Sequence, residues 1–284
     1  MRVAVFTIVK NEHKFLDEWI KYHLGLGIDE IYVYTDIGSD SHADICSECN
    51  VHHGFISDID TSLLSYKEMV FNRQLTYFRQ IADTISAESN IDWVAYLDVD
   101  EFITLHSEKT IHQLLAEFSQ YHCVILQWKN FNASGHILSP KGSVISNYST
   151  TCDICTGFNM NRCASCKMFI NVGKYSVAKV ALTHHIPVSA CRWCKTDFST
   201  NLFVPVYDKM YLRHYITKSF EDYCNKLYNR GQFYNSKGLA HFFLLNKDIR
   251  RDHPMVDSII NSYYDKYVNG DIDFLVKVRI QHDT

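Results

Sequence analysis

The fold is decided by the stretch VAVFTIVKNEHKFLDEWIKYHLGLGIDEIYVYT, residues 3–35. Residues 3–9 are a nearly continuous apolar run rich in β-branched side chains, which is typical of a buried parallel strand. Apolar residues then recur at helical spacing over residues 15–24, and a pair of glycines ends that helix. A second apolar run follows at residues 31–34. This order of strand, helix and strand predicts a βαβ unit.

The same alternation continues along the chain. A longer helix is expected over residues 63–82 and another buried strand over residues 93–97. A short helix is expected over residues 111–118 and a further strand over residues 123–128. The pattern predicts a doubly wound α/β sheet, in which ligands bind beyond the carboxyl ends of the strands. Such ends are followed by Lys10-Asn11-Glu12, by Asp36 and by Asp98-Val99-Asp100.

Asp98 and Asp100 stand two residues apart at the end of the strand expected over residues 93–97. Because side chains alternate along an extended chain, both carboxylates are expected to point to the same side. Two convergent carboxylates make a hard oxygen site suited to Mn²⁺ or Mg²⁺, with diphosphate oxygens completing the coordination. A cation there would neutralise charge that builds on a nucleoside-diphosphate leaving group. The alternative is an acidic turn that is merely solvated.

Four segments of the chain resemble glycosyltransferase family 92, a group of GT-A glycosyltransferases, and its bacterial family 2-like relatives. They are IVKNE with the following L, EWI and YHL in residues 8–24, the strand and loop of residues 32–40, WVAYLDVDEF in residues 93–102, and HYITKS with the later K and RG in residues 214–231. The resemblance implies a GT-A (Rossmann-like) α/β fold with a mixed, mainly parallel sheet flanked by helices. It also implies an enzyme, a glycosyltransferase of the hexosyltransferase type.

The resemblance assigns roles to individual residues. His214 would join Asp98 and Asp100 as a third ligand of Mn²⁺ or Mg²⁺, since imidazole is acceptable to Mn²⁺. The alternative for His214 is a hydrogen-bonded core histidine. Lys218, about one turn further on, would reach the diphosphate as a point charge. The residues expected to bind the nucleotide sugar are Thr7, Val9, Asn11, Glu12, Asp36, Arg73, Asp98, Lys167 and Lys218.

The implied reaction moves a sugar from a nucleoside-diphosphate sugar, by preference a UDP-sugar, to a hydroxyl of a glycan or glycolipid acceptor. The resemblance favours inversion, which requires a carboxylate base near the acceptor hydroxyl. The candidates are Glu101, Asp153 and Asp197. Strand alternation points Glu101 away from the acidic pair, which leaves a structural role as its alternative. A retaining mechanism would not require a base in the same place.

A cysteine-rich insert over about residues 150–195 departs from the family pattern. Eight of the 10 cysteines stand in C-x-x-C pairs, a spacing that lets two thiolates bind one tetrahedral Zn²⁺. The insert contains Cys152, Cys155, Cys163, Cys166, Cys191 and Cys194. One structural zinc takes four ligands, so which pairs would bind it stays open, and disulfides and reduced thiols are the alternatives. Trp128 with Ser134-Gly135 resembles the family's acceptor-side stretch, although Asn132 replaces an expected glycine, so the insert bears on the acceptor.

The expected organisation is one GT-A domain over residues 1–231, insert included, and a helical extension over residues 232–284 that packs on it. Apolar residues at helical spacing over residues 259–267 predict a terminal helix. No segment has the ~18 consecutive apolar residues that span a bilayer, and the N-terminus does not read as a secretory signal. We therefore expect a cytoplasmic protein. Activity at the inner face of a membrane, through peripheral contact with it, is an open alternative.

The net charge of −4 argues against nucleic acid as a partner. Residues 162–230 nevertheless carry 11 Lys and Arg against four Asp and Glu, which suits a site for a cation beside phosphates. Two other functions stay open. One is a different metal-dependent phosphoryl or nucleotidyl transferase, although the sequence lacks the phosphate-binding motif G-x-x-x-x-G-K-[ST]. The other is a non-enzymatic interaction module stabilised by zinc.

Overall fold

The computed structural model describes residues 1–35, 50–55, 80, 83–84, 90–106, 109–121, 123–152, 166–174, 196–197, 202–203, 208–229 and 236–269. The chain divides into two compact units. The first contains Met1–Lys129 and Cys155–His214, and the second contains Asn130–Ile154 and Tyr215–Thr284. The helix expected over residues 63–82 and most of the expected cysteine-rich insert lie outside the described residues.

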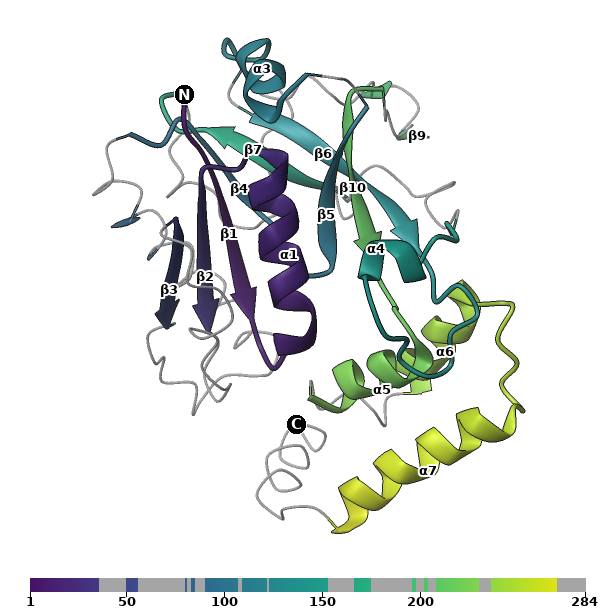
Figure 1. Cartoon of the computed structure of the whole chain (residues 1–284). Helices are drawn as coiled ribbons and strands as arrows, with labels where there is room; N and C mark the ends of the chain where they lie inside the picture. Colours follow the sequence, from purple (N-terminus) through teal and green to yellow (C-terminus); the bar gives the residue numbers. More distant parts are fainter. Residues whose placement is uncertain are drawn as a thin grey trace, which may run out of the picture. The chain divides into compact units, whose positions relative to one another are not determined.

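Eight strands form one mixed sheet. They are β1 (Val3–Val9), β2 (Glu30–Thr35), β3 (Val51–Phe55), β4 (Trp93–Tyr96), β5 (Glu101–Leu105), β6 (Cys123–Phe131), β7 (Cys166–Asn171) and β10 (Met210–Tyr215). Their order is β3-β2-β1-β4-β7-β6-β10-β5. The first four are parallel, and the arrows of β1, β2 and β3 point the same way in Figure 1. β7 runs antiparallel to β4 and β6, and β5 runs antiparallel to β10.

The apolar side chains of the parallel strands are buried, as expected from the nearly continuous apolar runs in their sequences. Phe6 of β1 stacks on Tyr32 of β2 with ring centroids 4.4 Å apart, and its centroid lies 6.0 Å from that of Tyr96 in β4. These residues are in-register partners across the strands. Cross-strand aromatic pairs therefore help to fix the register in this part of the sheet. The short strands β8 (Thr196–Asp197) and β9 (Leu202–Phe203) form a separate antiparallel pair.

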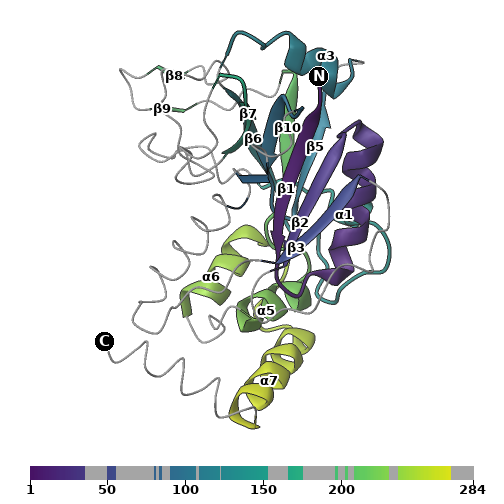
Figure 2. The same cartoon turned by 90° about the vertical axis from the view of Figure 1, so that its left-hand side faces the viewer.

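Helix α1 (His13–Leu26) lies against one face of the parallel strands (Figures 1 and 2). Its buried face consists of Leu16, Trp19, Ile20 and His23. The helix ends at Gly27, whose φ of 99° is left-handed and whose N–H donates to the Leu24 carbonyl oxygen (3.0 Å). α1 contacts β2, near one end of the sheet, and β5, at its other end. The sheet must therefore curl around the helix.

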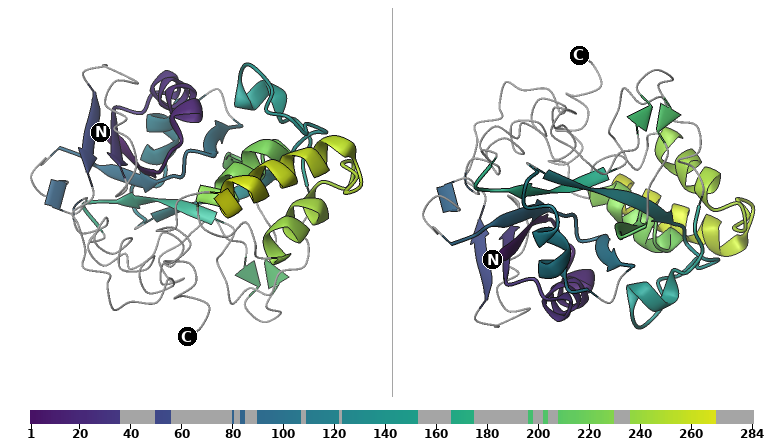
Figure 3. Two further views of the ribbon diagram at one scale, coloured as in Figure 1. Left: turned by 90° about the horizontal axis from the view of Figure 1, so that it is seen from below. Right: turned by 90° about the horizontal axis from the view of Figure 1, so that it is seen from above.

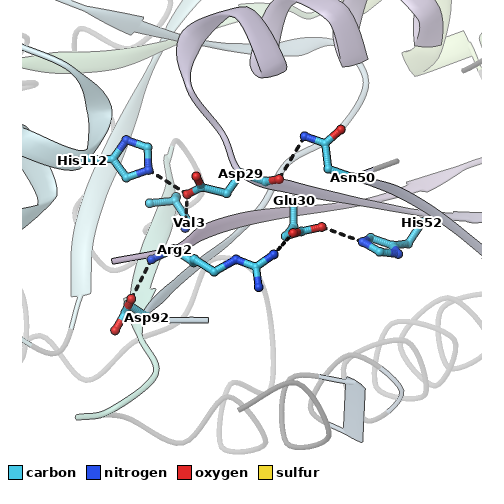
Figure 4. Close-up of polar contacts among 8 residues, drawn as sticks. All are labelled: Arg2, Val3, Asp29, Glu30, Asn50, His52, Asp92 and His112. Atoms are coloured by element: carbon cyan, nitrogen blue, oxygen red, sulfur yellow. Dashed lines mark hydrogen bonds and ion pairs between the residues drawn. The ribbon is translucent and has the colours of Figure 1, made fainter. Parts of the chain in front are cut away.

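Polar side chains join the amino ends of the parallel strands (Figure 4). Oδ2 of Asp29, at the start of β2, accepts the N–H of Val3 in β1 (2.7 Å). The neighbouring Glu30 pairs with Arg2 and with Nε2 of His52 in β3 (2.6 Å). These contacts fix the amino ends of the strands. The site was expected at the opposite edge of the sheet, at their carboxyl ends.

Helix α3 (Ile111–Ala116) is tied to the same edge of the sheet. Its N-terminus has a capping box, in which Oγ1 of Thr110 accepts the Gln113 N–H and Oε1 of Gln113 accepts the Thr110 N–H. His112 Nε2 lies 2.7 Å from Oδ2 of Asp29 (Figure 4). The short helix expected over residues 111–118 is thus confirmed, and it supports the amino end of β2.

The second unit is helical over much of its described length. It contains α4 (Val144–Asn147), α5 (Phe220–Asn229), α6 (Ser236–Leu245) and α7 (Pro254–Asn269). α5 packs against both α6 and α7 (Figure 3). The core between them includes Phe220 and Phe242, whose ring centroids lie 4.9 Å apart. α7 confirms the terminal helix expected around residues 259–267.

The expected α/β class is confirmed, since a curled mixed sheet is flanked by helices. In the described part of the sheet, the pairings among β3, β2, β1 and β4 are parallel, whereas those of β4 with β7, of β7 with β6 and of β10 with β5 are antiparallel. The antiparallel pairings involve the strands that follow β4 in the order of the sheet, which are β7, β6, β10 and β5. Within the described ranges, no helix combines the length and apolar character needed to cross a membrane.

Candidate active site

The chain turns sharply between β4 and β5, and this turn carries Asp98 and Asp100. The Glu101 N–H donates to the Asp98 carbonyl oxygen (3.0 Å), and the Asp98 N–H donates to Oε2 of Glu101 (2.9 Å). The Glu101 side chain therefore closes the turn. The Asp98 side chain is 55% exposed, whereas Asp100 is buried. Because β4 ends at Tyr96, a turn and not strand alternation sets the directions of the two carboxylates.

Strand β10 brings His214 to the acidic turn from far along the chain. In the antiparallel pairing of β10 with β5, His214 stands directly opposite Glu101. Nε2 of His214 lies 3.9 Å from Oδ1 of Asp100. The His214 ring is buried, and its centroid lies 4.2 Å from that of Trp128 in β6. The sheet thus places the imidazole beside one of the two predicted carboxylate ligands.

The Asp100 and His214 donor atoms lie near enough to approach one divalent cation. Two donors each about 2.1 Å from an octahedral ion are about 3.0 Å apart on neighbouring positions and about 4.2 Å apart on opposite ones, so the 3.9 Å separation would change slightly when an ion binds. Oxygen and imidazole nitrogen are donors that Mn²⁺ accepts. No group of three His, Cys, Asp or Glu side chains that could hold a metal ion occurs among the described residues. Asp98, Asp100 and His214 are thus not gathered into one such group, and the three-ligand assignment stays a prediction.

Lys167 of β7 pairs with the acidic turn. Its Nζ donates to Oδ2 of Asp98 (3.0 Å) and lies 3.6 Å from Oε2 of Glu101. Lys167 and Glu101 are both fully buried, with side-chain exposures of 2% and 0%. The contact explains how a buried acidic group is tolerated, since an unpaired charge in this position would be strongly unfavourable. Lys167, expected among the residues that bind the nucleotide sugar, neutralises the turn in this structure.

Burial raises the pKa of Glu101 well above its ordinary value, against the opposing influence of the Lys167 ammonium. Burial alone would lower the pKa of Lys167, but the nearby Asp98 and Glu101 raise it above its ordinary value. Lys167 therefore stays positively charged. Glu101 is enclosed and engaged with the Asp98 N–H and Lys167, an arrangement that suits holding the turn in shape.

Three side chains of α1 bind the backbone of β5 next to the turn. The Trp19 indole N–H donates to the Glu101 carbonyl oxygen (2.8 Å), and the Tyr22 hydroxyl donates to the Ile103 carbonyl oxygen (2.6 Å). The Ile103 N–H donates to Nε2 of His23 (3.4 Å). β5 is the end strand of the sheet, so α1 covers polar groups that an edge would otherwise expose. These positioning contacts were not expected, although polar aromatic residues on the buried helix face were a signal for them.

The residues expected at the end of β1 lie at the same sheet edge as the acidic turn, because β1 and β4 are parallel neighbours. Thr7 and Val9 are buried, and Oγ1 of Thr7 has no hydrogen-bond partner among the described residues. Asn11 has a φ of 55°, a left-handed conformation that asparagine tolerates better than most residues. The Glu12 carbonyl oxygen accepts the N–H groups of Phe15 and Leu16 in the first turn of α1. Residues 10–12 thus form the turn from β1 to α1, at the place where nucleotide binding was predicted.

Lys218 belongs to the second unit, in the segment between β10 and α5. It is buried and has a φ of 55°. Several other predicted residues fall outside the described residues: Asp36, Arg73, Asp153, Cys155, Cys163, Cys191 and Cys194. Of Asp197 in β8 and Cys166 in β7, only the backbone is described. Cys152 is partly buried. The roles assigned to these residues stay predictions.

Comparison with models of known protein families shows to which family the chain is related. A family model described as "Glycosyltransferase family 92" matches residues 61–243, well over half of the sequence. The chain belongs to glycosyltransferase family 92. This membership confirms the resemblance inferred from the four segments. The matched stretch of this family 92 chain contains the acidic turn, Lys167, His214 and Lys218.

Curated relatives share the family name at modest identity. A glycosyltransferase family 92 protein of Oryza sativa subsp. japonica is 23% identical over 152 residues, covering 51% of this chain and 24% of the relative. A family 92 protein of Ricinus communis is 24% identical over 153 residues, covering 50% of this chain and 25% of the relative. The family 92 chain thus matches about a quarter of the length of these relatives.

Two solved structures align with part of the chain. Core-mannan synthase A from Aspergillus fumigatus in its Mn/GDP form aligns with a TM-score of 0.35 and 8% identity, covering 68% of this chain and 72% of that one. The mannosyltransferase Ktr4p from S. cerevisiae in complex with GDP aligns with a TM-score of 0.28 and 9% identity, covering 47% and 42%. These similarities are too weak to assign a ligand to the family 92 chain.

Proposed function

We propose that this family 92 chain is a metal-dependent glycosyltransferase that uses a nucleoside-diphosphate sugar, foremost a UDP-sugar, and a glycan or glycolipid acceptor. The observation that carries the proposal is the 3.9 Å approach of His214 to Asp100 at the turn after β4. The turn lies at the carboxyl edge of the parallel strands, where ligands bind in sheets of this kind. Membership of a glycosyltransferase family favours sugar transfer over the phosphoryl or nucleotidyl transfer that the acidic pair alone would allow.

The proposal gives the described residues separate tasks. Asp100 and His214 would hold Mn²⁺ or Mg²⁺, with Asp98 beside them. The cation, when bound, neutralises charge on the departing nucleoside diphosphate. Lys167 keeps Asp98 in place and balances the turn electrostatically. Lys218 would bind the diphosphate with its ammonium group, as the family resemblance implies.

In the proposed inverting reaction, the acceptor oxygen bonds to the anomeric carbon while the bond from that carbon to the diphosphate breaks. A carboxylate takes the proton of the acceptor hydroxyl. Glu101 is fully buried and closes the acidic turn, so we favour a positioning role for it. Asp153 and Asp197 are then the better candidates for the base. A structural zinc on the cysteine pairs is a separate proposal, and metal analysis of the purified protein tests it.

A product-release assay tests the proposed activity. Purified protein is incubated with UDP- and GDP-sugars, and release of the nucleoside diphosphate is measured with Mn²⁺, with Mg²⁺ and with EDTA. We expect release from one donor class, dependent on the cation, and a loss of at least about 100-fold in Asp100→Asn, since a metal ion contributes several kcal/mol to such steps.

The matched control is Asp17→Asn, which changes a partly exposed carboxylate of α1 in the same unit. It should retain wild-type release. Full activity of Asp100→Asn, or unchanged turnover in EDTA, would contradict the proposed metal dependence. Absence of release from every sugar nucleotide would contradict the proposed activity itself.

A further inference from the structure

The backbone at Lys218 adopts a conformation that a lysine seldom takes. Its φ of 55° lies in the left-handed region, where the side chain of an L-residue crowds its own carbonyl group. Lys218 is also only 4% exposed. A non-glycine residue keeps such a conformation only where its surroundings determine it, and residues of this kind cluster at binding sites. What surrounds Lys218 therefore bears on its proposed task.

The peptide bond that follows Lys218 is held by Tyr148. The Ser219 N–H, which belongs to that peptide, donates to the Tyr148 hydroxyl oxygen (3.1 Å). The Tyr148 hydroxyl in turn donates to Oδ2 of Asp222 (3.2 Å). Burial, together with the negative charge of Asp222, raises the pKa of Tyr148 above its ordinary value, so its hydroxyl keeps its proton. A fixed phenol thus limits rotation of the peptide next to Lys218.

Asp222 accepts hydrogen bonds from several hydroxyl groups near this peptide. Its Oδ2 accepts hydrogen bonds from the Ser219 hydroxyl (2.7 Å) and the Ser139 hydroxyl (2.7 Å), in addition to the bond from Tyr148. Its N–H donates to Oγ of Ser219 (3.0 Å), which caps the start of α5. One carboxylate oxygen thus fixes three hydroxyls and the first turn of the helix that follows Lys218.

Residues 136–139, which directly follow the stretch that resembles the acceptor side, are bonded to the same helix start. The Phe220 N–H donates to the His136 carbonyl oxygen (3.1 Å), and the Glu221 N–H donates to the Ile137 carbonyl oxygen (2.9 Å). The Ser139 N–H donates to Oε2 of Glu221 (2.9 Å). On the other side of Lys218, Nδ2 of Asn246 lies 3.5 Å from Oγ1 of Thr217. The lysine is therefore flanked by fixed groups on both sides.

We propose that Tyr148 and Asp222 are positioning residues that hold the Lys218–Ser219 peptide in the conformation in which Lys218 binds the diphosphate of the donor. This inference rests on the proposed function, which supplies the diphosphate. It goes beyond that function because neither residue is expected to touch the donor. Their contribution passes through Lys218, so removing Lys218 should also remove their effect on binding.

A double-mutant cycle on nucleotide affinity tests the inference. The dissociation constants of UDP and of GDP are measured by calorimetry in the presence of Mn²⁺ for wild type, Tyr148→Phe, Lys218→Met and the double variant. For the nucleotide that binds, we expect Tyr148→Phe to weaken binding about 10-fold, as for residues that orient a ligand-binding group. In the Lys218→Met background, the same change should alter affinity by less than about 2-fold, because coupled residues are not additive.

The matched control is Tyr223→Phe, which removes a hydroxyl of α5 in the same unit that donates to the Gly238 carbonyl oxygen (3.1 Å). It should leave the affinity unchanged. Asp222→Asn, which keeps a hydrogen-bond acceptor, should weaken binding less than Asp222→Ala, and this pair gives the answer if Tyr148→Phe does not fold.

The possible failures can be told apart. If wild type binds neither UDP nor GDP with Mn²⁺, the proposed function fails and the inference fails with it. If wild type binds and Tyr148→Phe binds equally well, only the inference is overturned. If Tyr148→Phe weakens binding equally with and without Lys218, the network acts as general support of the unit, and the positioning role is wrong.

Discussion

Lys167 is the cation on which the acidic turn depends. It is buried beside a buried glutamate, Glu101, and it donates to the partly exposed Asp98. Without it, the acidic groups would face one another with no compensating charge, since Asp100 lies in the same turn. Removing one partner of a buried ion pair is far more harmful than the net contribution of the intact pair suggests. The residue is therefore expected to matter for folding as well as for the site.

Replacing Lys167 with methionine keeps the length of the side chain and removes the charge. We expect Lys167→Met to lower the free energy of unfolding by about 3 kcal/mol, because Asp98 and Glu101 lose their compensating cation. Urea denaturation followed by circular dichroism measures the change. Lys174→Met, at an exposed position after β7, is the control and should shift the free energy by less than about 0.5 kcal/mol. Equal stability of the two variants would contradict the assigned role.

At the scale of elements, the contact between α1 and β5 links the opening βαβ unit to the end strand of the sheet. His23 lies at the centre of this contact and is fully buried. Its Nδ1 lies 2.8 Å from the Trp19 carbonyl oxygen, so Nδ1 must carry the proton, and Nε2 accepts the Ile103 N–H. A second proton, on Nε2, would point at the Ile103 N–H, which is itself a donor. The ring is therefore built into the fold in its neutral form.

This arrangement predicts a pH dependence of stability. Burial lowers the pKa of His23 to about 4, against an ordinary value of 6.5. Below pH 6.5 the unfolded chain takes up a proton that the folded chain refuses, so stability falls as the pH drops toward 4. At ~1.4 kcal/mol per pKa unit, the loss is about 3 kcal/mol. His23→Asn should lack this part of the loss, and parallel stability curves for variant and wild type from pH 7 to 4 would refute the assignment.

The elements that could be predicted are those whose pattern is local. β1, α1 and β2 follow from apolar spacing and a terminal glycine over residues 3–35. The Asp100–His214 approach could not follow from spacing, because it depends on the pairing of β10 with β5 across more than a hundred residues. The family resemblance supplied that pairing of residues, but not its geometry. Likewise, the resemblance placed Lys167 among the residues that bind the nucleotide sugar, and only the antiparallel position of β7 beside β4 reveals its bond to Asp98.

The Tyr148–Asp222 network had only one local signal in the sequence. Tyr148 lies in a segment without helical or strand periodicity, and Asp222 reads as an ordinary acidic residue in the first turn of a helix. Hydroxyl groups from residues 139, 148 and 219 meet Asp222 only through tertiary folding of the second unit. A serine three residues before an aspartate at a helix start was the single local hint, and it predicts a cap alone.

At the scale of the whole molecule, each of the two units carries its own core and its own network of fixed polar groups. The first unit contains the acidic turn, His214 and the α1 contacts that support β5. The second contains Lys218 and the network around it. Each group is fixed by bonds within its own unit. The central claim is that Asp100 and His214 together bind the cation on which donor binding depends.

The most direct test is calorimetric titration of the protein with UDP, and in parallel with GDP, in Mn²⁺ and in EDTA. The account predicts binding of a nucleoside diphosphate in Mn²⁺ and a loss of about 100-fold or more in EDTA, in Asp100→Ala and in His214→Ala. The exposed Asp252→Ala, in the second unit, should bind like wild type. Wild-type affinity in EDTA, or in both variants with Mn²⁺ present, would contradict the claim.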